Sequence, residues 1–278
     1  MLQVEEVSNK IKVFPMDNIL EIRNVSKKFV SKNKEILALD NVTFNVKYNE
    51  FLSIVGPSGC GKSTLLRLIA GLEKPTSGEI LMEGRRIEGP GAERGMVFQQ
   101  YSLYPWRNVL NNVAFGLEVR GIPKRERYEI ARRFIKMTGL EGFEEAYPYE
   151  LSGGMQQRVA IARTLANDPK VVLMDEPFAA LDVQTRTILQ HELLKIWEKE
   201  KKTVVFVTHS VEEAIYLSDR VIVMTARPGR IKDIIPIDLP RPRKRDSLEF
   251  LEYKRRIVNI LKDEVLKSYN MYKCSTMG

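Results

Sequence analysis

The chain alternates between short apolar runs, which are typical of buried strands, and longer stretches with apolar residues at helical spacing. The predicted strands lie at 20–25, 42–46, 51–55, 80–82, 96–98, 171–174, 204–207 and 221–224. Predicted helices follow several of them, at 63–70, 183–199 and 211–217. Strands that alternate with helices in this way form a mainly parallel sheet with helices on its faces. The sequence therefore predicts an α/β fold.

The stretch from about 100 to 165 differs from the rest because its predicted elements are helices. These helices are expected at 109–119, 124–138 and 155–166. We therefore expect a helical subdomain inserted into the α/β domain. A final amphipathic helix is predicted at 247–269. The expected organisation has three parts, an N-terminal extension, a main domain and a basic C-terminal tail, at 1–17, 18–240 and 241–278.

The formal net charge of the 278 residues is +8, and most of the basic excess lies near the C-terminus. Residues 227–278 hold 13 Lys and Arg against 7 Asp and Glu, without the interleaved aromatics of a single-strand nucleic-acid platform. We therefore expect a solvated or partner-facing tail and no nucleic-acid partner. No apolar run approaches the ~20 residues that cross a bilayer, and the first residues lack the apolar stretch of a signal peptide. These features predict a cytoplasmic protein.

A glycine-rich segment follows the predicted strand at 51–55 and leads into the helix at 63–70. It matches the phosphate-binding pattern GxxxxGK[ST] at every required position, with the residues Gly56, Pro57, Ser58, Gly59, Cys60, Gly61, Lys62 and Ser63. The backbone N–H groups of such a loop and the positive N-terminal end of its helix surround phosphate oxygens. We expect Lys62 to reach the β- and γ-phosphates, Ser63 to bind Mg²⁺ and Thr64 to donate to a phosphate.

Polar residues follow three of the later strands, where open α/β sheets place their chemistry. Asp175 and Glu176 end one strand, His209 ends the next and Gln99 follows a third. Asp175 is expected to hold Mg²⁺ through its water shell, and Glu176 to orient or deprotonate the water that attacks the γ-phosphate. His209 is expected to hydrogen-bond the γ-phosphate, and Gln99 to touch Mg²⁺ or the water. Taken singly, a solvated acidic turn, a surface histidine and a plain loop amide remain alternatives, and the adjacent Gln100 competes with Gln99.

A second candidate anion site lies at Leu151-Ser152-Gly153-Gly154-Met155. Ser152 is expected to cap a helix, and the two glycines permit close approach to its backbone. The segment resembles the LSGGQ signature of the ATPases of ABC transporters, with Met155 in place of the final Gln. This resemblance spans about residues 18–240. It implies a P-loop NTPase of the ABC type, with a mainly parallel core sheet, an antiparallel β subdomain and the helical subdomain at about 100–165.

The resemblance also implies how the site is completed. In this family the signature of a second copy closes each site, so that two ATP molecules lie between the members of a head-to-tail homodimer. By the same resemblance, Phe29 is the aromatic that stacks on adenine, and Asp182 belongs to the loop that crosses the dimer interface. Gln99 and His209 correspond to the family's glutamine of the Q-loop and its switch histidine.

Four segments, at 89–95, 101–106, 226–230 and 238–243, resemble the nitrate, sulfonate and taurine importer branch of that family. This implies an ATP-hydrolysing importer subunit on the cytoplasmic face of the membrane, with two permease subunits and an external substrate-binding protein. A soluble ABC ATPase for nucleic acid or ribosomes is the alternative. It is disfavoured because only 95 residues separate the phosphate-binding loop from the signature, which leaves no room for a long coiled coil. The signature also disfavours a P-loop kinase or GTPase.

Overall fold

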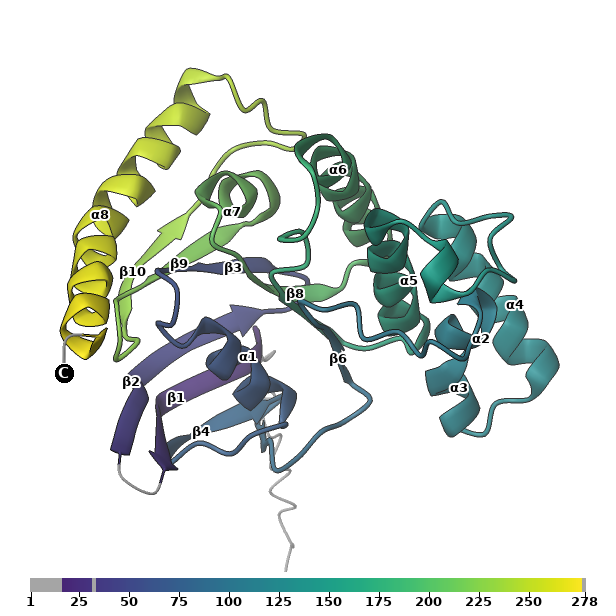
Figure 1. Cartoon of the computed structure of the whole chain (residues 1–278), viewed down its shortest axis with the longest axis horizontal. Coiled ribbons are helices and arrows are strands. Elements are labelled where there is room, and N and C mark those ends of the chain that lie inside the picture. Colours follow the sequence, from purple (N-terminus) through teal and green to yellow (C-terminus); the bar gives the residue numbers. More distant parts are fainter. Residues whose placement is uncertain (1–16, 32–33, 277–278) are drawn as a thin grey trace, which may run out of the picture.

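The computed structural model describes residues 17–31 and 34–276 (Figure 1). The predicted N-terminal extension, apart from Asp17, lies outside the described residues. The described residues form two sheets with helices between and around them. Within this part of the chain, no helix combines the length and the apolar character that a bilayer crossing needs.

The larger sheet has six strands in the order β10-β9-β3-β8-β7-β6. They are β3 (Phe51–Val55), β6 (Arg94–Val97), β7 (Val171–Asp175), β8 (Thr203–Val207), β9 (Arg220–Met224) and β10 (Ile231–Pro236). All neighbours are parallel except β10, which is antiparallel to β9. Every residue of β3, β7 and β8 is buried, which is why their sequences are continuous apolar runs rather than alternating ones. The predicted parallel core is confirmed.

The smaller sheet is antiparallel, with the order β2-β1-β4-β5. Its strands are β1 (Asn18–Ser31), β2 (Lys34–Lys47), β4 (Ser77–Met82) and β5 (Arg85–Arg86). Helix α1 (Lys62–Ala70) packs between the two sheets, and its apolar side chains join both sheets in one core cluster. The phosphate-binding segment therefore starts in one sheet and leads into a helix that both sheets hold. The antiparallel subdomain implied by the resemblance is confirmed.

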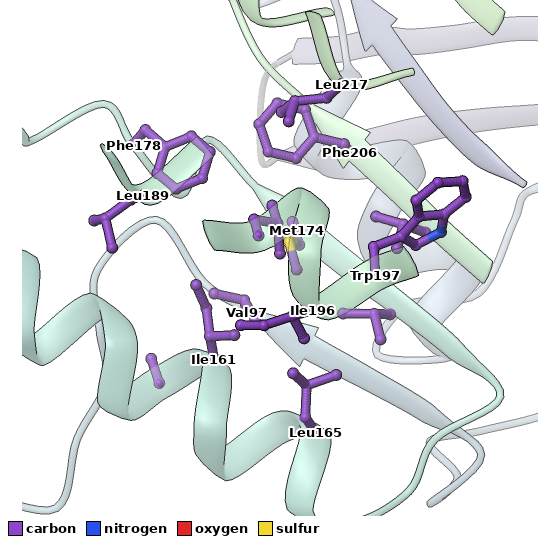
Figure 2. Close-up of a cluster of buried hydrophobic side chains, with 14 of the residues drawn as sticks. Val97, Ile161, Leu165, Met174, Phe178, Leu189, Ile196, Trp197, Phe206 and Leu217 are labelled. Atoms are coloured by element: carbon purple, nitrogen blue, oxygen red, sulfur yellow. The ribbon is translucent and has the colours of Figure 1, made fainter. Parts of the chain in front are cut away.

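The inserted region is helical as predicted. It contains α2 (Val109–Val113), α3 (Phe115–Val119), α4 (Lys124–Met137), a short 3-10 turn at Pro148–Glu150 and α5 (Gly153–Ala166). The predicted single helix at 109–119 is in fact two short helices that meet at Ala114. Figure 2 shows Ile161 and Leu165 of α5 close to Val97, Met174 and Ile196 of the main domain. The helical region is therefore joined to the sheet by a shared apolar core.

The remaining helices are α6 (Val183–Glu200), α7 (Val211–Leu217) and α8 (Leu248–Thr276). Helix α8 lies along β10 (Figure 1) and buries Phe250 and Ile257. The expectation of a solvated tail is wrong for Arg243, which is buried and donates to the carbonyls of Ile215, Ser218, Ile237 and Leu239. Burial, together with the charge of Arg241, lowers the pKa of Arg243 to about 10. Sequence charge counting missed this because it cannot detect buried carbonyls that lack partners.

Candidate active site

A cavity of about 500 Å³ opens where β3 runs into α1. Nine of the predicted site residues line it: Phe29, Ser58, Gly59, Gly61, Lys62, Ser63, Thr64, Gln99 and Glu176. Gly56, Pro57 and Cys60 complete the loop without lining the cavity, and burial raises the pKa of the Cys60 thiol. Three further lining residues, Ile36, Ala38 and Arg227, were not predicted from the sequence.

The backbone of the loop needs its glycines. Gly59 and Gly61 have φ angles of 72° and 103°, which residues with side chains rarely adopt. The buried amine of Lys62 donates to the carbonyls of Gly56 (2.8 Å) and Pro57 (3.1 Å). The loop is thus wrapped around this amine and leads into the start of α1, where an anion is favoured.

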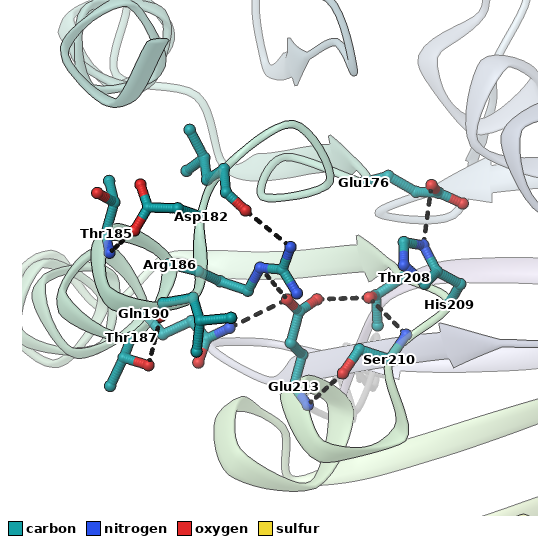
Figure 3. Close-up of polar contacts among 12 residues, drawn as sticks. Glu176, Asp182, Thr185, Arg186, Thr187, Gln190, Thr208, His209, Ser210 and Glu213 are labelled. Carbon is teal, nitrogen blue, oxygen red and sulfur yellow. Dashed lines mark hydrogen bonds and ion pairs between the residues drawn. The ribbon is translucent and has the colours of Figure 1, made fainter. Parts of the chain in front are cut away.

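The carboxylates predicted to act on phosphate lie beside this loop. Ser63 Oγ donates to Asp175 Oδ1 at 2.9 Å. Burial raises the pKa of Asp175 above its ordinary value, against the opposing effect of the Ser63 hydrogen bond. Glu176 has a φ angle of 45°, a strained value for a residue with a side chain. Its carboxylate lies 3.2 Å from Nδ1 of His209, so the ends of β7 and β8 bring these two side chains together (Figure 3).

Behind this pair lies a buried polar network that sequence reasoning missed (Figure 3). The carboxylate of Glu213 on α7 accepts hydrogen bonds from Thr208 Oγ1 and from Gln190 Nε2 (3.1 Å), and Arg186 Nε lies 3.7 Å away. Arg186 also donates to the carbonyl of Leu181, in the loop before α6 (2.9 Å). Burial raises the pKa of Glu213. The sequence feature that could have pointed to this network is the position of Glu213 directly before the apolar run at 214–217.

The loop before α6 also contains Asp182, which caps that helix. Its carboxylate accepts the backbone N–H groups of Gln184 and Thr185, each at 3.0 Å. These bonds, that of Thr185 above all, lower the pKa of Asp182. The side chain is exposed and does not line the cavity. The network of Glu213 therefore connects the loop of Asp182 with the loop of His209.

The signature segment begins α5, also outside the cavity. Ser152 caps the helix as predicted, and its hydroxyl accepts the N–H of Met155 at 3.3 Å. An added Cβ on Gly154 would lie 2.7 Å from Cγ2 of Thr185, so this glycine lets α5 and α6 pack closely. Ser152, Gly153 and Gly154 do not line the cavity of their own chain. Within one chain, the two candidate anion sites are therefore separate.

Comparison with known proteins identifies the family. The sequence pattern of the ABC transporter family matches residues 39–179. An uncharacterized ABC transporter ATP-binding protein of Methanocaldococcus jannaschii is 70% identical, over 90% of this chain and 93% of that protein. The nitrate import ATP-binding protein of Synechocystis is 48% identical, over 87% of this chain and 95% of that protein. The taurine import ATP-binding protein of Roseobacter denitrificans is 53% identical, over 76% of this chain and 80% of that protein.

Among solved structures, the dimeric post-hydrolysis state of an ATP-binding cassette bound to ADP and Pi is similar. It has a TM-score of 0.71 and 37% identity, and the match covers 80% of this chain and all of that one. The nucleotide-sized cavity, its phosphate-binding loop and these relatives agree with one another. The chain therefore belongs to the ABC transporter family and is one of its ATP-binding, ATP-hydrolysing subunits.

Proposed function

We propose that this chain powers an importer and that two copies meet head to tail to complete each nucleotide site. The observation that carries the proposal is the separation of the two anion sites within one chain. The phosphate-binding loop lines the cavity, whereas the N-terminus of α5, capped by Ser152, does not. Ser152, Gly153 and Gly154 of a second copy would cover the terminal phosphate. The dimeric cassette among the similar structures supports this arrangement.

The oxygen atoms beside the loop fit a Mg²⁺ ion. The Ser63 hydroxyl and the Asp175 carboxylate are 2.9 Å apart, and Gln99 lines the same cavity. Hydroxyl, carboxylate and amide oxygens are ligands that Mg²⁺ accepts, alongside waters and phosphates. We infer that Ser63 and Gln99 hold the ion directly and that Asp175 holds it through water. Held by these residues beside bound ATP, the ion would supply positive charge that offsets the negative charge of the phosphates.

The other residues have separate tasks in hydrolysis. Phe29, half exposed at the cavity, offers an aromatic face for adenine. Lys62 and the N–H groups of the loop hold the phosphates. Glu176 takes a proton from the attacking water, and His209, in contact with Glu176, hydrogen-bonds the γ-phosphate. Asp182, exposed at the start of α6, reaches the partner copy.

A second cavity, of about 620 Å³, suits a protein partner. It lies between β6 and α3, and its lining includes Met96, Phe115 and Val119, of which Val119 is 72% exposed. We propose that a helix of a permease subunit inserts here. The chain would then work on the cytoplasmic face of the membrane, beneath two permeases served by an external binding protein. The names of the nitrate and taurine relatives support a nitrate- or sulfonate-like cargo.

Mixing two defective variants tests the shared site. In Lys62→Ala the loop cannot hold phosphate, and in Ser152→Glu a carboxylate repels the terminal phosphate. Each variant alone should lack ATPase activity. A mixed dimer contains one intact site, built from the loop of one copy and the signature of the other, so mixing should restore turnover above that of either variant. If no ratio of the two variants restores any rate, the head-to-tail arrangement is refuted.

Extraction of native membranes with detergent tests the partner. Affinity purification of the chain should recover membrane-embedded permease subunits, and Val119→Glu, at the second cavity, should release them while ATP binding persists. Val258→Glu provides the same substitution at an exposed valine on α8, away from that cavity, and should keep the complex. Recovery with ribosomes or DNA instead of permeases would favour the soluble alternative.

A further inference from the structure

The turn between β9 and β10 is packed against the phosphate-binding loop, although no nucleotide-binding pattern includes it. Gly229 donates its N–H to the carbonyl of Ala38 (2.9 Å) and accepts the N–H of Asp40 (3.0 Å). An added Cβ on Gly229 would lie 2.0 Å from the carbonyl oxygen of Cys60. The turn therefore contacts both the loop and strand β2, which lie on two sides of the nucleotide cavity.

Arg227 extends from this turn to the cavity. Its Nε donates to the carbonyl of Gly59 at 3.1 Å, and the side chain is exposed and lines the cavity. Among the residues that line the cavity, the basic ones are Lys62 and Arg227. Arginine carries five N–H donors, and those of Arg227 other than Nε form no hydrogen bond to any residue that the structure describes. This guanidinium therefore has donors free for a ligand.

Helix α8 fixes the position of the turn. The carboxylate of Glu264, which is 2% exposed, accepts the backbone N–H of Ala226 at 2.9 Å. It also accepts hydrogen bonds from Lys232 (2.7 Å) and Lys267 (2.9 Å). Burial alone would raise the pKa of Glu264, but these hydrogen bonds outweigh it and lower the pKa to about 2. A charged carboxylate from the C-terminal tail thus holds the residue directly before Arg227.

We propose that Arg227 is a nucleotide-binding residue whose guanidinium contacts the phosphate chain of ATP, and that Glu264 positions it. The proposal rests on this cavity being the ATP site. A planar guanidinium pairs with phosphate oxygens through two parallel hydrogen bonds, so it suits a polyanion that enters beside Gly59. Arg227, within the segment at 226–230, then has a function in nucleotide binding, and the tail acts on the site through a single carboxylate.

Calorimetric titration with a non-hydrolysable ATP analogue, with ADP and with adenosine tests the proposal directly. Arg227→Ala should raise the Kd of the ATP analogue about 5-fold, the upper range for an exposed ion pair. The effect should be smaller for ADP and vanish for adenosine, and Arg227→Lys should recover part of the affinity. Arg230→Ala removes the same charge from the same turn, where Arg230 pairs with Asp40 (2.9 Å), and should leave Kd unchanged.

The position of Arg227 is tested by Glu264→Gln. This variant should weaken binding of the ATP analogue in the same direction but less, and should add nothing to Arg227→Ala in the double variant. Equal loss for adenosine and ATP would overturn the phosphate contact. If Arg227→Ala binds the ATP analogue with unchanged affinity while Lys62→Ala loses affinity, the role of Arg227 is overturned but the site itself is not. Unchanged affinity in Lys62→Ala as well would show that the proposed site itself is wrong.

Discussion

The buried carboxylate of Glu213 gives the sharpest test of the packing behind the active site. Glu213→Ala would remove the acceptor of Thr208 and Gln190, which are 1% and 2% exposed. Each buried donor left without a partner costs about 1–3 kcal/mol, although the Thr208 hydroxyl can turn to another acceptor. Arg186 also loses the carboxylate that lies 3.7 Å from it. We therefore expect the free energy of unfolding to fall by about 3 kcal/mol.

Glu213→Gln separates the shape of this side chain from its charge. It keeps the size and one carbonyl acceptor, so the loss at pH 5 should be about 1 kcal/mol. Burial raises the pKa of Glu213 above its ordinary 4.5, which means that the folded state favours the neutral carboxyl. Its contribution to stability is therefore full below pH 4.5 and is lost as the pH rises through the folded pKa. Glutamine does not titrate, so the difference between the two proteins should shrink from pH 5 to pH 8.

Urea unfolding followed by circular dichroism measures both effects. Glu212→Ala is the matched control, because the neighbouring Glu212 is exposed and pairs with Lys254 at the surface, and it should cost less than about 0.5 kcal/mol. An unfolding midpoint of Glu213→Ala equal to that of wild type would refute the stabilising network. A difference between wild type and Glu213→Gln that grows with pH would refute the raised pKa.

Three further changes give distinct results. Glu176→Gln should lower the rate of phosphate release at least 100-fold while calorimetry still detects ATP binding, as expected for loss of a general base. Gly229→Ala should lower the melting temperature, because its Cβ would lie 2.0 Å from Cys60 O and the backbone must move. We expect this movement to lower the free energy of unfolding by about 1–3 kcal/mol. Glu264→Gln should cost about 2 kcal/mol at pH 7, and since the folded pKa is about 2, the difference from wild type should disappear as the pH falls from 4.5 toward 2.

Each of these has a clear contrary outcome. Full turnover in Glu176→Gln would assign proton removal to another group. An unchanged melting temperature in Gly229→Ala would mean that the turn is loosely held. Gly89→Ala, at an open position where φ is not positive, serves as a control for glycine replacement without crowding or backbone strain. A stability difference in Glu264→Gln that persists at pH 2 would show that packing, rather than charge, dominates there.

Much of the site was predictable because its functional residues lie in short segments whose sequence pattern alone indicates their role. The loop from Gly56 to Ser63 must have its glycines and lysine at fixed spacing, and Asp175 and His209 end apolar runs whose strand character is plain. Since β7 and β8 are parallel neighbours, their ends bring Glu176 and His209 together. The structure places these residues as the sequence predicts, and their roles in hydrolysis stay predictions.

The parts that sequence reasoning missed depend on contacts between distant segments. Arg227 lies 168 positions from Gly59, whose carbonyl it contacts. Strand β10 was missed because its sequence, Ile231–Pro236, shows no clean alternation, and it pairs with β9 through tertiary folding. A count of charged residues treats Arg243 as a surface residue, and only the fold reveals the four carbonyls that accept its hydrogen bonds. The boundaries of the predicted parts at 17/18 and 240/241 stay predictions.

The clamp formed by Glu264 has a practical consequence for shortened forms of this protein. A chain cut after residue 240 would retain every nucleotide-binding pattern, yet it would lose the acceptor of the Ala226 N–H and the guanidinium of Arg243. Weak nucleotide binding by such a fragment would then result from displacement of the turn between β9 and β10, rather than from loss of a regulatory module. Kinetic work on the cassette therefore needs α8 in place.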